Sequence, residues 1–132
     1  MILGFKPQFK EPILNGTKIH TIREDKNNRW HFGKLIQFAT GVRTKNYHCF
    51  KEGVCFGTQR IEIKHQAGFV EVFIDGVHFG EIYHHGLDDI YEYTVDLINL
   101  AKNDGFENIE DFFKWFNKDF KGKIIHWTKF KY

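Results

Sequence analysis

Several residue types are scarce in this chain of 132 residues, which has 2 Cys, 2 Pro and 1 Met. No apolar stretch approaches the roughly 18 residues that a membrane-spanning helix needs. The apolar start, Met1 to Phe5, is too short for the core of a signal peptide and is followed at once by Lys6. We therefore expect neither a membrane span nor a targeting segment, and the cytoplasm as the location.

The cysteines, Cys49 and Cys55, are expected to be free thiols because a reducing compartment does not sustain disulfides. A zinc site with His48 and His65 as further ligands is the alternative. The spacing Cys-x5-Cys is not that of a usual zinc pair, and no CxxC motif is present. Neither cysteine lies in a recognisable nucleophile setting. The sequence therefore predicts no metal and no cofactor.

Aromatic residues, in contrast, are plentiful: 15 Phe, 5 Tyr and 3 Trp make up 17% of the chain. Hydrophobic residues reach 42% and charged residues 27%, so the composition is that of a folded chain. A length of 132 residues suits one domain with one ring-rich core. No repeat or linker divides it, so residues 1–132 are expected to form a single domain.

The net charge of +2 is too small to indicate nucleic-acid binding by itself. Positive charge is concentrated near the C-terminal end, however. The lysines there are Lys114, Lys118, Lys121, Lys123, Lys129 and Lys131. They form either a basic face or an ordinary solvated surface.

Turn residues divide the first part of the chain into a short helix and several strands. The spacing of Phe9 and Ile13 predicts a helix over residues 7–15, with Gly16 at the usual place of a C-terminal glycine. Strands are expected at residues 18–23, 35–40, 54–63, 69–74 and 77–79. The polar stretch 41–53 is expected to be an insertion loop.

The remaining signals complete an α+β pattern. Asp75-Gly76 between apolar runs predicts a two-residue hairpin turn. Further elements are expected as a helix from Thr94 that ends at Gly105, a helix capped by Asn108 and a strand over 123–130. Antiparallel hairpins without βαβ alternation favour a curled sheet or partial barrel with flanking helices.

Residues 13–23 carry the most informative chemistry. Lys18, Thr21 and Arg23 follow the helix-ending Gly16 closely, which places an amine, a hydroxyl and a guanidinium together. Such a set can bind a carbonyl or phosphate oxygen and offer a nucleophile. In a regular strand Lys18 would point away from Thr21 and Arg23, so we place Lys18 on the turn before the strand. The alternative is a partly exposed strand with ordinary polar residues.

The order of these residues resembles the opening of ASCH domains, which belong to the PUA-like superfamily of β-barrels. The matching pattern is Phe9, then Ile13-Leu-x-Gly-x-Lys-x-x-Thr-Ile-Arg23, a loop, Gly33 and a strand. The run from Leu100 to Phe116 resembles the family's alanine-x-x-acid-glycine-phenylalanine segment and its following helix. The two matches together cover about half of the chain. The resemblance implies an α+β, PUA-like, partly open antiparallel barrel.

The closest pattern is that of small amidohydrolases that remove the acetyl group from N4-acetylcytidine. The resemblance implies a catalytic set of Lys18, Thr21 and Asp104, in which Asp104 stands where the family has Glu. Ligand-binding roles are expected for three further residues, namely Gly16, Arg23 and Trp30. The alternative is an RNA-binding module, with RNA cleavage as a further possibility. The expected partner is a modified nucleoside or RNA. This chain is longer than the minimal enzymes, chiefly in the segment 43–57.

Overall fold

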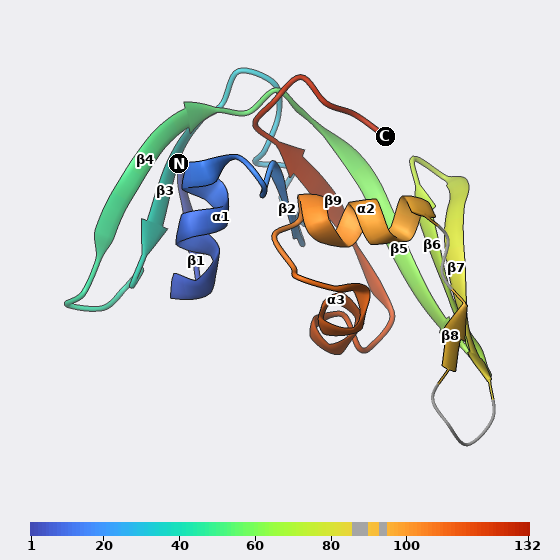
Figure 1. Ribbon diagram of the computed structural model, residues 1–132. Coiled ribbons are helices and arrows are strands. Elements are labelled where there is room, and N and C mark those ends of the chain that lie inside the picture. The colour runs from blue at the N-terminus through green and yellow to red at the C-terminus, as the bar shows by residue number, and fades with distance from the viewer. Residues whose placement is uncertain (86–89, 93–94) are drawn as a thin grey trace.

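The computed structural model describes residues 1–85, 90–92 and 95–132. The described residues form an α+β fold, mostly strands, which confirms the expected class (Figure 1). The helical elements are η1 (Pro7–Phe9), α1 (Lys10–Asn15), α2 (Val95–Asn103) and α3 (Ile109–Trp115). The strands are β1 (Ile2–Phe5), β2 (His20–Arg23), β3 (Leu35–Thr40), β4 (His48–Val54), β5 (Gly57–Gln66), β6 (Phe69–Ile74), β7 (Val77–His85), β8 (Ile90–Glu92) and β9 (Phe120–His126).

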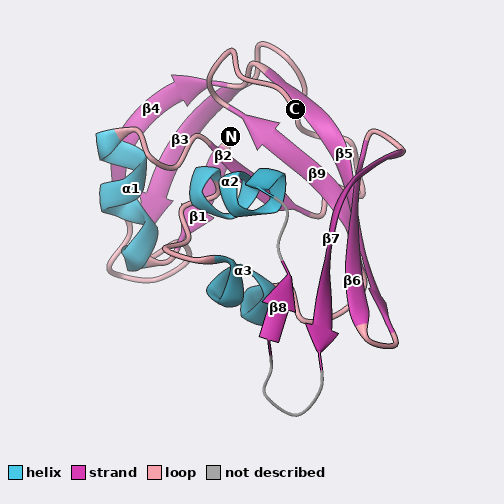
Figure 2. Ribbon diagram, turned by 45° about the vertical axis from the view of Figure 1, so that its right-hand side comes forward, coloured by secondary structure: helices cyan, strands magenta, loops and turns pink. Residues whose placement is uncertain are grey.

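The strands form two sheets, of order β1-β3-β4 and β2-β9-β5-β6-β7-β8. The sheets are curved, and α2 and α3 lie on their concave side (Figures 1 and 2). Strand pairing is antiparallel as expected, except that β1 runs parallel to β3. Parallel neighbours need a crossover, and here η1, α1 and β2 lie between the two strands in the chain.

Aromatic and aliphatic side chains fill the space between the sheets and the helices. Phe38 is fully buried, and its ring makes a T-shaped contact with Trp127 at 4.9 Å between centroids. Phe5, on the neighbouring strand β1, stacks on Phe38 with 6.0 Å between ring centroids. Helices contribute Leu100 and Phe112 to the same core. Trp127 is therefore a core residue.

The structure confirms one predicted hairpin turn and one predicted helix cap. Asp75 and Gly76 both have positive φ angles, 52° and 79°, as a two-residue hairpin between paired strands requires. Asn108 accepts a hydrogen bond from the Asp111 backbone N–H at 2.8 Å and so caps α3. The expected cap Thr94 lies outside the described residues.

The stretch 41–53 departs from expectation, because it is not a loop throughout. Residues from His48 to Val54 form β4, which pairs with β3 along its length. This strand is polar because it lies at the edge of its sheet and no residue in it is fully buried. Strand β1 was not expected from the sequence either.

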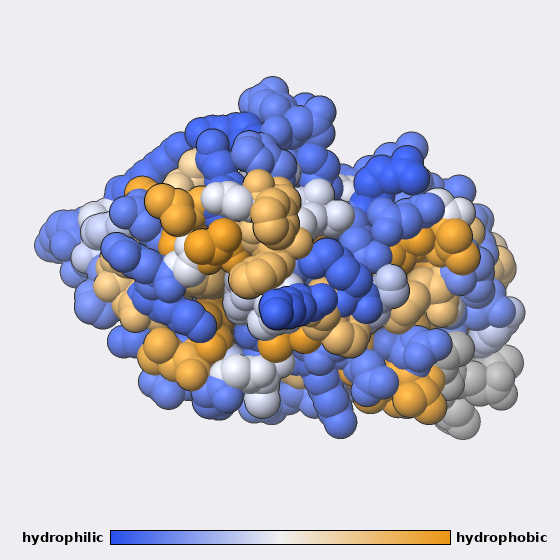
Figure 3. Space-filling model, turned by 90° about the horizontal axis from the view of Figure 1, so that it is seen from above, coloured by the Kyte–Doolittle hydropathy of each residue, from blue (hydrophilic) through white to orange (hydrophobic). Residues whose placement is uncertain are grey.

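Exposed apolar side chains gather where β3 begins and β4 ends. Phe32 is 73% exposed and Leu35 is 67% exposed, and Val54 and Phe56 lie beside them. Figure 3 shows apolar residues gathered among polar ones on this upper face. None of these four residues lines the cavity described below. No described helix is long and apolar enough to cross a membrane.

Candidate functional site

The turn between α1 and β2 sets the position of Lys18. Helix α1 ends at Gly16, which has a φ of 84° and whose N–H donates to the carbonyl of Ile13. The Lys18 N–H then donates to Pro12 O at 2.9 Å, and the Ile19 N–H donates to Asn103 O at 2.9 Å. Lys18 thus lies before β2, as predicted, and is anchored to both α1 and the end of α2.

The end of α2 delivers the carboxylate. The Asp104 N–H donates to Leu100 O at 3.0 Å, so Asp104 continues the helical turn. Gly105 follows with a φ of 91°, a conformation that favours glycine. A Cβ at this position would lie 2.7 Å from Lys18 Cδ. Glycine therefore both ends the helix and leaves room for the lysine stem.

Lys18 and Asp104 form a buried ion pair. Lys18 Nζ donates to Asp104 Oδ1 at 3.2 Å and to the Asp104 carbonyl at 2.5 Å. Only 2% of Lys18 and 3% of Asp104 are exposed. Burial lowers the pKa of Lys18, while the charge of Asp104 opposes this and Arg23 adds to it. Lys18 is therefore a candidate base, because a lowered pKa makes its neutral form accessible.

Thr21 and Arg23 lie together on β2, two residues apart and on one face of the strand. Arg23 Nε donates to Thr21 Oγ1 at 3.1 Å, and Arg23 Nη2 donates to Gly4 O at 2.5 Å. The guanidinium also lies over the Phe5 ring, 5.0 Å from its centroid. These contacts fix the guanidinium, which in turn polarises the Thr21 hydroxyl.

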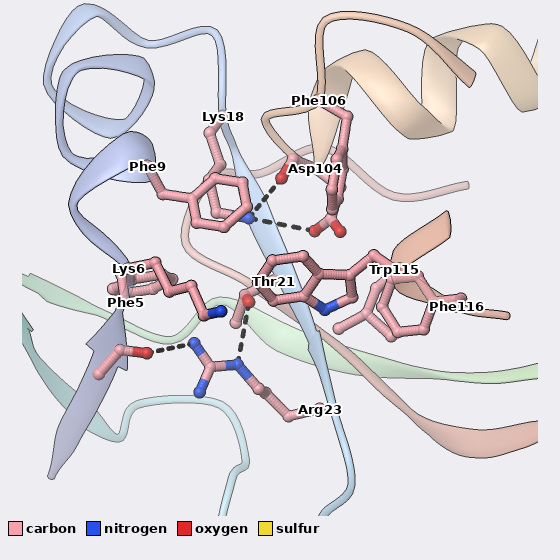
Figure 4. A pocket seen from close by; sticks show the side chains of 12 residues that line it. Phe5, Lys6, Phe9, Lys18, Thr21, Arg23, Asp104, Phe106, Trp115 and Phe116 are labelled. Atoms are coloured by element: carbon pink, nitrogen blue, oxygen red, sulfur yellow. Dashed lines mark hydrogen bonds and ion pairs between the residues drawn. The ribbon is translucent and has the colours of Figure 1, made fainter. Parts of the chain in front are cut away.

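These side chains meet in one cavity of about 210 Å³ (Figure 4). Lys18, Thr21, Arg23 and Asp104 supply its polar wall. Its other walls are aromatic, formed by Phe5, Phe9, Phe106, Trp115 and Phe116. Lys6 extends toward the cavity near Thr21 and Arg23 (Figure 4). The cavity thus combines a candidate base, a hydroxyl and a cation with flat apolar surfaces.

The remaining expected ligand contacts lie elsewhere. Gly16 caps α1 and does not line the cavity. Trp30 is 7% exposed and belongs to the core, because the loop after β2 folds back as Asp25 Oδ2 accepts from the Trp30 N–H. The tryptophan that lines the cavity is Trp115 and not Trp30. Trp115 is 46% exposed. Nothing in the sequence distinguished Trp115 from other core rings, because it lies on an amphipathic helix.

Sequence reasoning missed His20 and Tyr132. His20 is fully buried, with Nδ1 3.2 Å from Asp104 Oδ1 and Nε2 2.5 Å from Tyr132 Oη. Burial lowers the pKa of His20, and the hydrogen bond to Asp104 opposes this shift. The position of His20 between Lys18 and Thr21 was the available signal. Tyr132 offered none, because it lies 112 residues from His20 in the chain.

No metal-ligand arrangement involves the cavity in the part of the chain that is described. There, the His, Cys, Asp and Glu group with ligand atoms close together is Glu71, His78 and Glu81, at most 4.8 Å apart. These residues lie on β6 and β7 and do not line the cavity. Cys49 and Cys55 are free thiols, as expected.

Comparison with models of protein families, with curated proteins and with solved structures finds no match to the chain. Function is therefore inferred from the chemistry of the cavity and from the resemblance found in the sequence. Of the six residues expected in the site, the cavity lining includes Lys18, Thr21, Arg23 and Asp104.

Proposed function

We propose that the chain is an ASCH-type, PUA-like domain and an amidohydrolase that acts on N4-acylated cytosine nucleosides such as N4-acetylcytidine. The two curved sheets would correspond to the partly open barrel of that superfamily. The observation that carries the proposal is the meeting of buried Lys18 with Thr21 in one cavity, with Asp104 as the lysine's partner. The expected residues come from segments more than 80 positions apart in the chain.

The shorter side chain of Asp104 is compatible with this role. The family pattern has Glu at this position, and Asp is one methylene shorter. Asp104 Oδ1 nevertheless lies 3.2 Å from Lys18 Nζ. The turn at Gly105 brings the helix end close to Lys18, so the aspartate reaches the ammonium group.

The reaction begins with activation of Thr21. Neutral Lys18 takes the proton of Thr21 Oγ1, and the oxygen attacks the carbonyl carbon of the N4-acyl group. In the unliganded protein Lys18 Nζ donates to Asp104 and Arg23 Nε donates to Thr21 Oγ1. Lys18 must therefore turn toward Thr21 when substrate binds, as catalytic hydrogen bonds often tighten only in the complex.

Collapse of the tetrahedral intermediate releases the base. The guanidinium of Arg23, which already faces Thr21 Oγ1, stabilises the negative charge on the former carbonyl oxygen. Protonated Lys18 returns the proton to the cytosine N4 as the C–N bond breaks, which leaves an acyl ester on Thr21. Water, deprotonated by Lys18, then hydrolyses this ester and regenerates the hydroxyl.

The shape of the cavity suits a flat base with a small acyl group. Its volume of about 210 Å³ lies below the roughly 300–1,000 Å³ of sites for drug-sized ligands. Phe9, Phe106 and Trp115 offer ring faces and edges on which a pyrimidine can pack. We expect the ribose to extend toward the exposed edge of Trp115.

The test is release of cytidine from N4-acetylcytidine by wild-type protein and Lys18→Met. We expect release by the wild type and a loss of at least about a thousandfold in kcat in the variant. Lys26→Met is the matched control, because Lys26 is highly exposed and lies outside the cavity. Equal rates for Lys18→Met and the wild type would refute the proposal.

A binding module for RNA is the second candidate, supported by positive charge in the cavity lining. Among the described ion pairs, Lys6 and Arg23 have no carboxylate partner. The C-terminal lysines support it less, because Lys123 pairs with Asp25 at 3.0 Å. RNA affinity through several phosphates would fall steeply between 50 and 200 mM salt, by about a thousandfold or more. Turnover of a neutral nucleoside would change little over this range.

A further inference from the structure

Buried polar side chains continue from Asp104 beyond the cavity wall. Asp104 Oδ1 lies 3.2 Å from both Lys18 Nζ and His20 Nδ1. On the far side of the imidazole, His20 Nε2 lies 2.5 Å from Tyr132 Oη. The same hydroxyl oxygen accepts a hydrogen bond from Asn103 Nδ2 at 3.1 Å. His20 does not line the cavity. Its hydrogen bond to the cavity wall is the one to Asp104.

The bonding groups on both sides determine the tautomer of His20. A carboxylate can only accept hydrogen bonds, so His20 Nδ1 must carry a proton and donate to Asp104. Tyr132 Oη accepts from Asn103, so its own proton is free to be donated to His20 Nε2. Neutral His20 with its proton on Nδ1 satisfies every group in the row.

Tyr132 is held firmly enough to impose this arrangement. Its backbone N–H donates to Gln59 Oε1 at 2.9 Å, and its carbonyl accepts from Gln59 Nε2 at 3.1 Å. Gln59 is 7% exposed and lies on β5. The tyrosine is thus fixed by main-chain contacts and not only by the histidine that it contacts.

We propose that His20, held by Tyr132 with its proton on Nδ1, is a positioning residue that stabilises the Asp104 carboxylate when Lys18 is neutral. The role rests on the proposed function, in which neutral Lys18 acts as the base. When Lys18 gives up its proton, the Asp104 charge loses its cationic partner in a buried site. The His20 N–H remains as its donor, which makes that state less unfavourable.

Other charged and titratable groups lie around this row. Arg23 on β2 acts on Lys18, and the ring of His126 on β9 lies 5.4 Å from that of His20. Lys131 and Asp75 act on His126 with opposite signs. The substitutions below leave Arg23, Lys131 and Asp75 in place. His20→Leu and His20→Asn both remove the ring contact with His126, so a difference in Lys18 titration between these two variants reports on the hydrogen bond to Asp104.

The first test reads the tautomer of His20 from the nitrogen-15 NMR signals of its ring, assigned with the His20→Asn variant. We expect a protonated Nδ1 and an unprotonated Nε2 in the wild type near pH 7. Tyr132→Phe removes the hydroxyl that donates to Nε2, so we expect the Nε2 signal to shift while Nδ1 stays protonated against Asp104. A wild-type ring protonated on Nε2, or an Nε2 signal that is unchanged in Tyr132→Phe, would overturn the inference.

The second test follows the titration of Lys18 by carbon-13 NMR of its Cε, assigned with Lys18→Met. In His20→Leu we expect the midpoint to rise by about one pH unit, since the neutral lysine state loses its support. In His20→Asn the amide nitrogen occupies nearly the place of Nδ1, so the midpoint should stay near the wild-type value. If His20→Leu does not fold, Tyr132→Phe should shift the midpoint in the same direction by less.

A midpoint unchanged in a folded His20→Leu variant, or in Tyr132→Phe, would refute the role. Both readings need no substrate, so they are separate from the hydrolysis test. Hydrolysis of N4-acetylcytidine with an unshifted Lys18 would leave the proposed function standing and remove only the role of His20.

Discussion

At the scale of single residues, the buried pair of Lys18 and Asp104 affects both the free energy of unfolding and the proposed reaction. Both side chains are almost completely buried, and each satisfies the other. Removing one partner of such a pair is costly, whereas removing both charges together costs little. The pair is therefore a feature that stability alone does not require.

A double-mutant cycle measures this coupling. We expect Lys18→Met and Asp104→Asn each to lower the free energy of unfolding by about 3 kcal/mol, because a buried group loses its partner. The double variant should lose clearly less than the sum of the two. Urea denaturation at neutral pH provides the values, and strictly additive losses would show that the two side chains are not coupled.

His126 predicts a dependence of stability on pH. Burial lowers its pKa from 6.5 to about 3, and its Nδ1 has no hydrogen-bond partner among the described residues. The unfolded chain therefore binds more protons than the folded one between these pH values. The contribution is fully present above pH 6.5 and is lost as the pH falls, with a slope of up to about 1.4 kcal/mol per unit.

The measurement is the free energy of unfolding between pH 6.5 and 5.5, where carboxylates titrate little. Buried His20, whose pKa is also lowered, adds to the fall in the same direction. We expect a smaller fall in His126→Gln than in the wild type. His48→Gln is the control, because His48 is exposed on β4. An unchanged fall in His126→Gln would contradict the assignment.

At the scale of elements, the junction after α2 shapes the site. Gly105 has a φ of 91°, and a Cβ there would meet the Lys18 stem at 2.7 Å and Phe9 Cδ1 at 3.1 Å. Gly68 has a similar φ of 86° but no atom within 4 Å of an added Cβ. The two glycines differ in what surrounds them and not in their backbone.

This contrast separates steric crowding from backbone strain. Gly68→Ala should cost about 1–2 kcal/mol of unfolding free energy from the left-handed backbone alone. Gly105→Ala should cost about 1–3 kcal/mol more, because the added methyl displaces the Lys18 stem. Denaturant unfolding of both variants gives the difference. Equal costs would show that the site tolerates a side chain at position 105.

Elements with strong local signals could be predicted, and those that depend on partners could not. The Asp75-Gly76 turn and the Asn108 cap depend on neighbours within a few residues, so the sequence carries them. Strand β4 is polar and gains its structure from pairing with β3, which no local pattern reveals. The parallel pairing of β1 with β3 likewise depends on contacts between separate segments.

At the scale of the whole molecule, the candidate site is built from segments that are distant in the sequence. The α1–β2 turn supplies Lys18, and the end of α2 supplies Asp104, 86 positions later. The resemblance at both segments made this pair predictable. The link from His20 to Tyr132 was not, because it exists only once β2, β9 and the residues after β9 have assembled. Trp30 was assigned to the cavity because the folding back of its loop could not be anticipated.

The most direct test of the account is cytidine release from N4-acetylcytidine by the wild type beside Thr21→Val. Valine keeps the shape of threonine and removes only the hydroxyl that is proposed to attack. Thr58→Val on β5 is the matched control, because Thr58 lies outside the cavity. The account predicts release by the wild type and by Thr58→Val, and its loss in Thr21→Val. Release by Thr21→Val at the wild-type rate, or no release by the wild type, would contradict it.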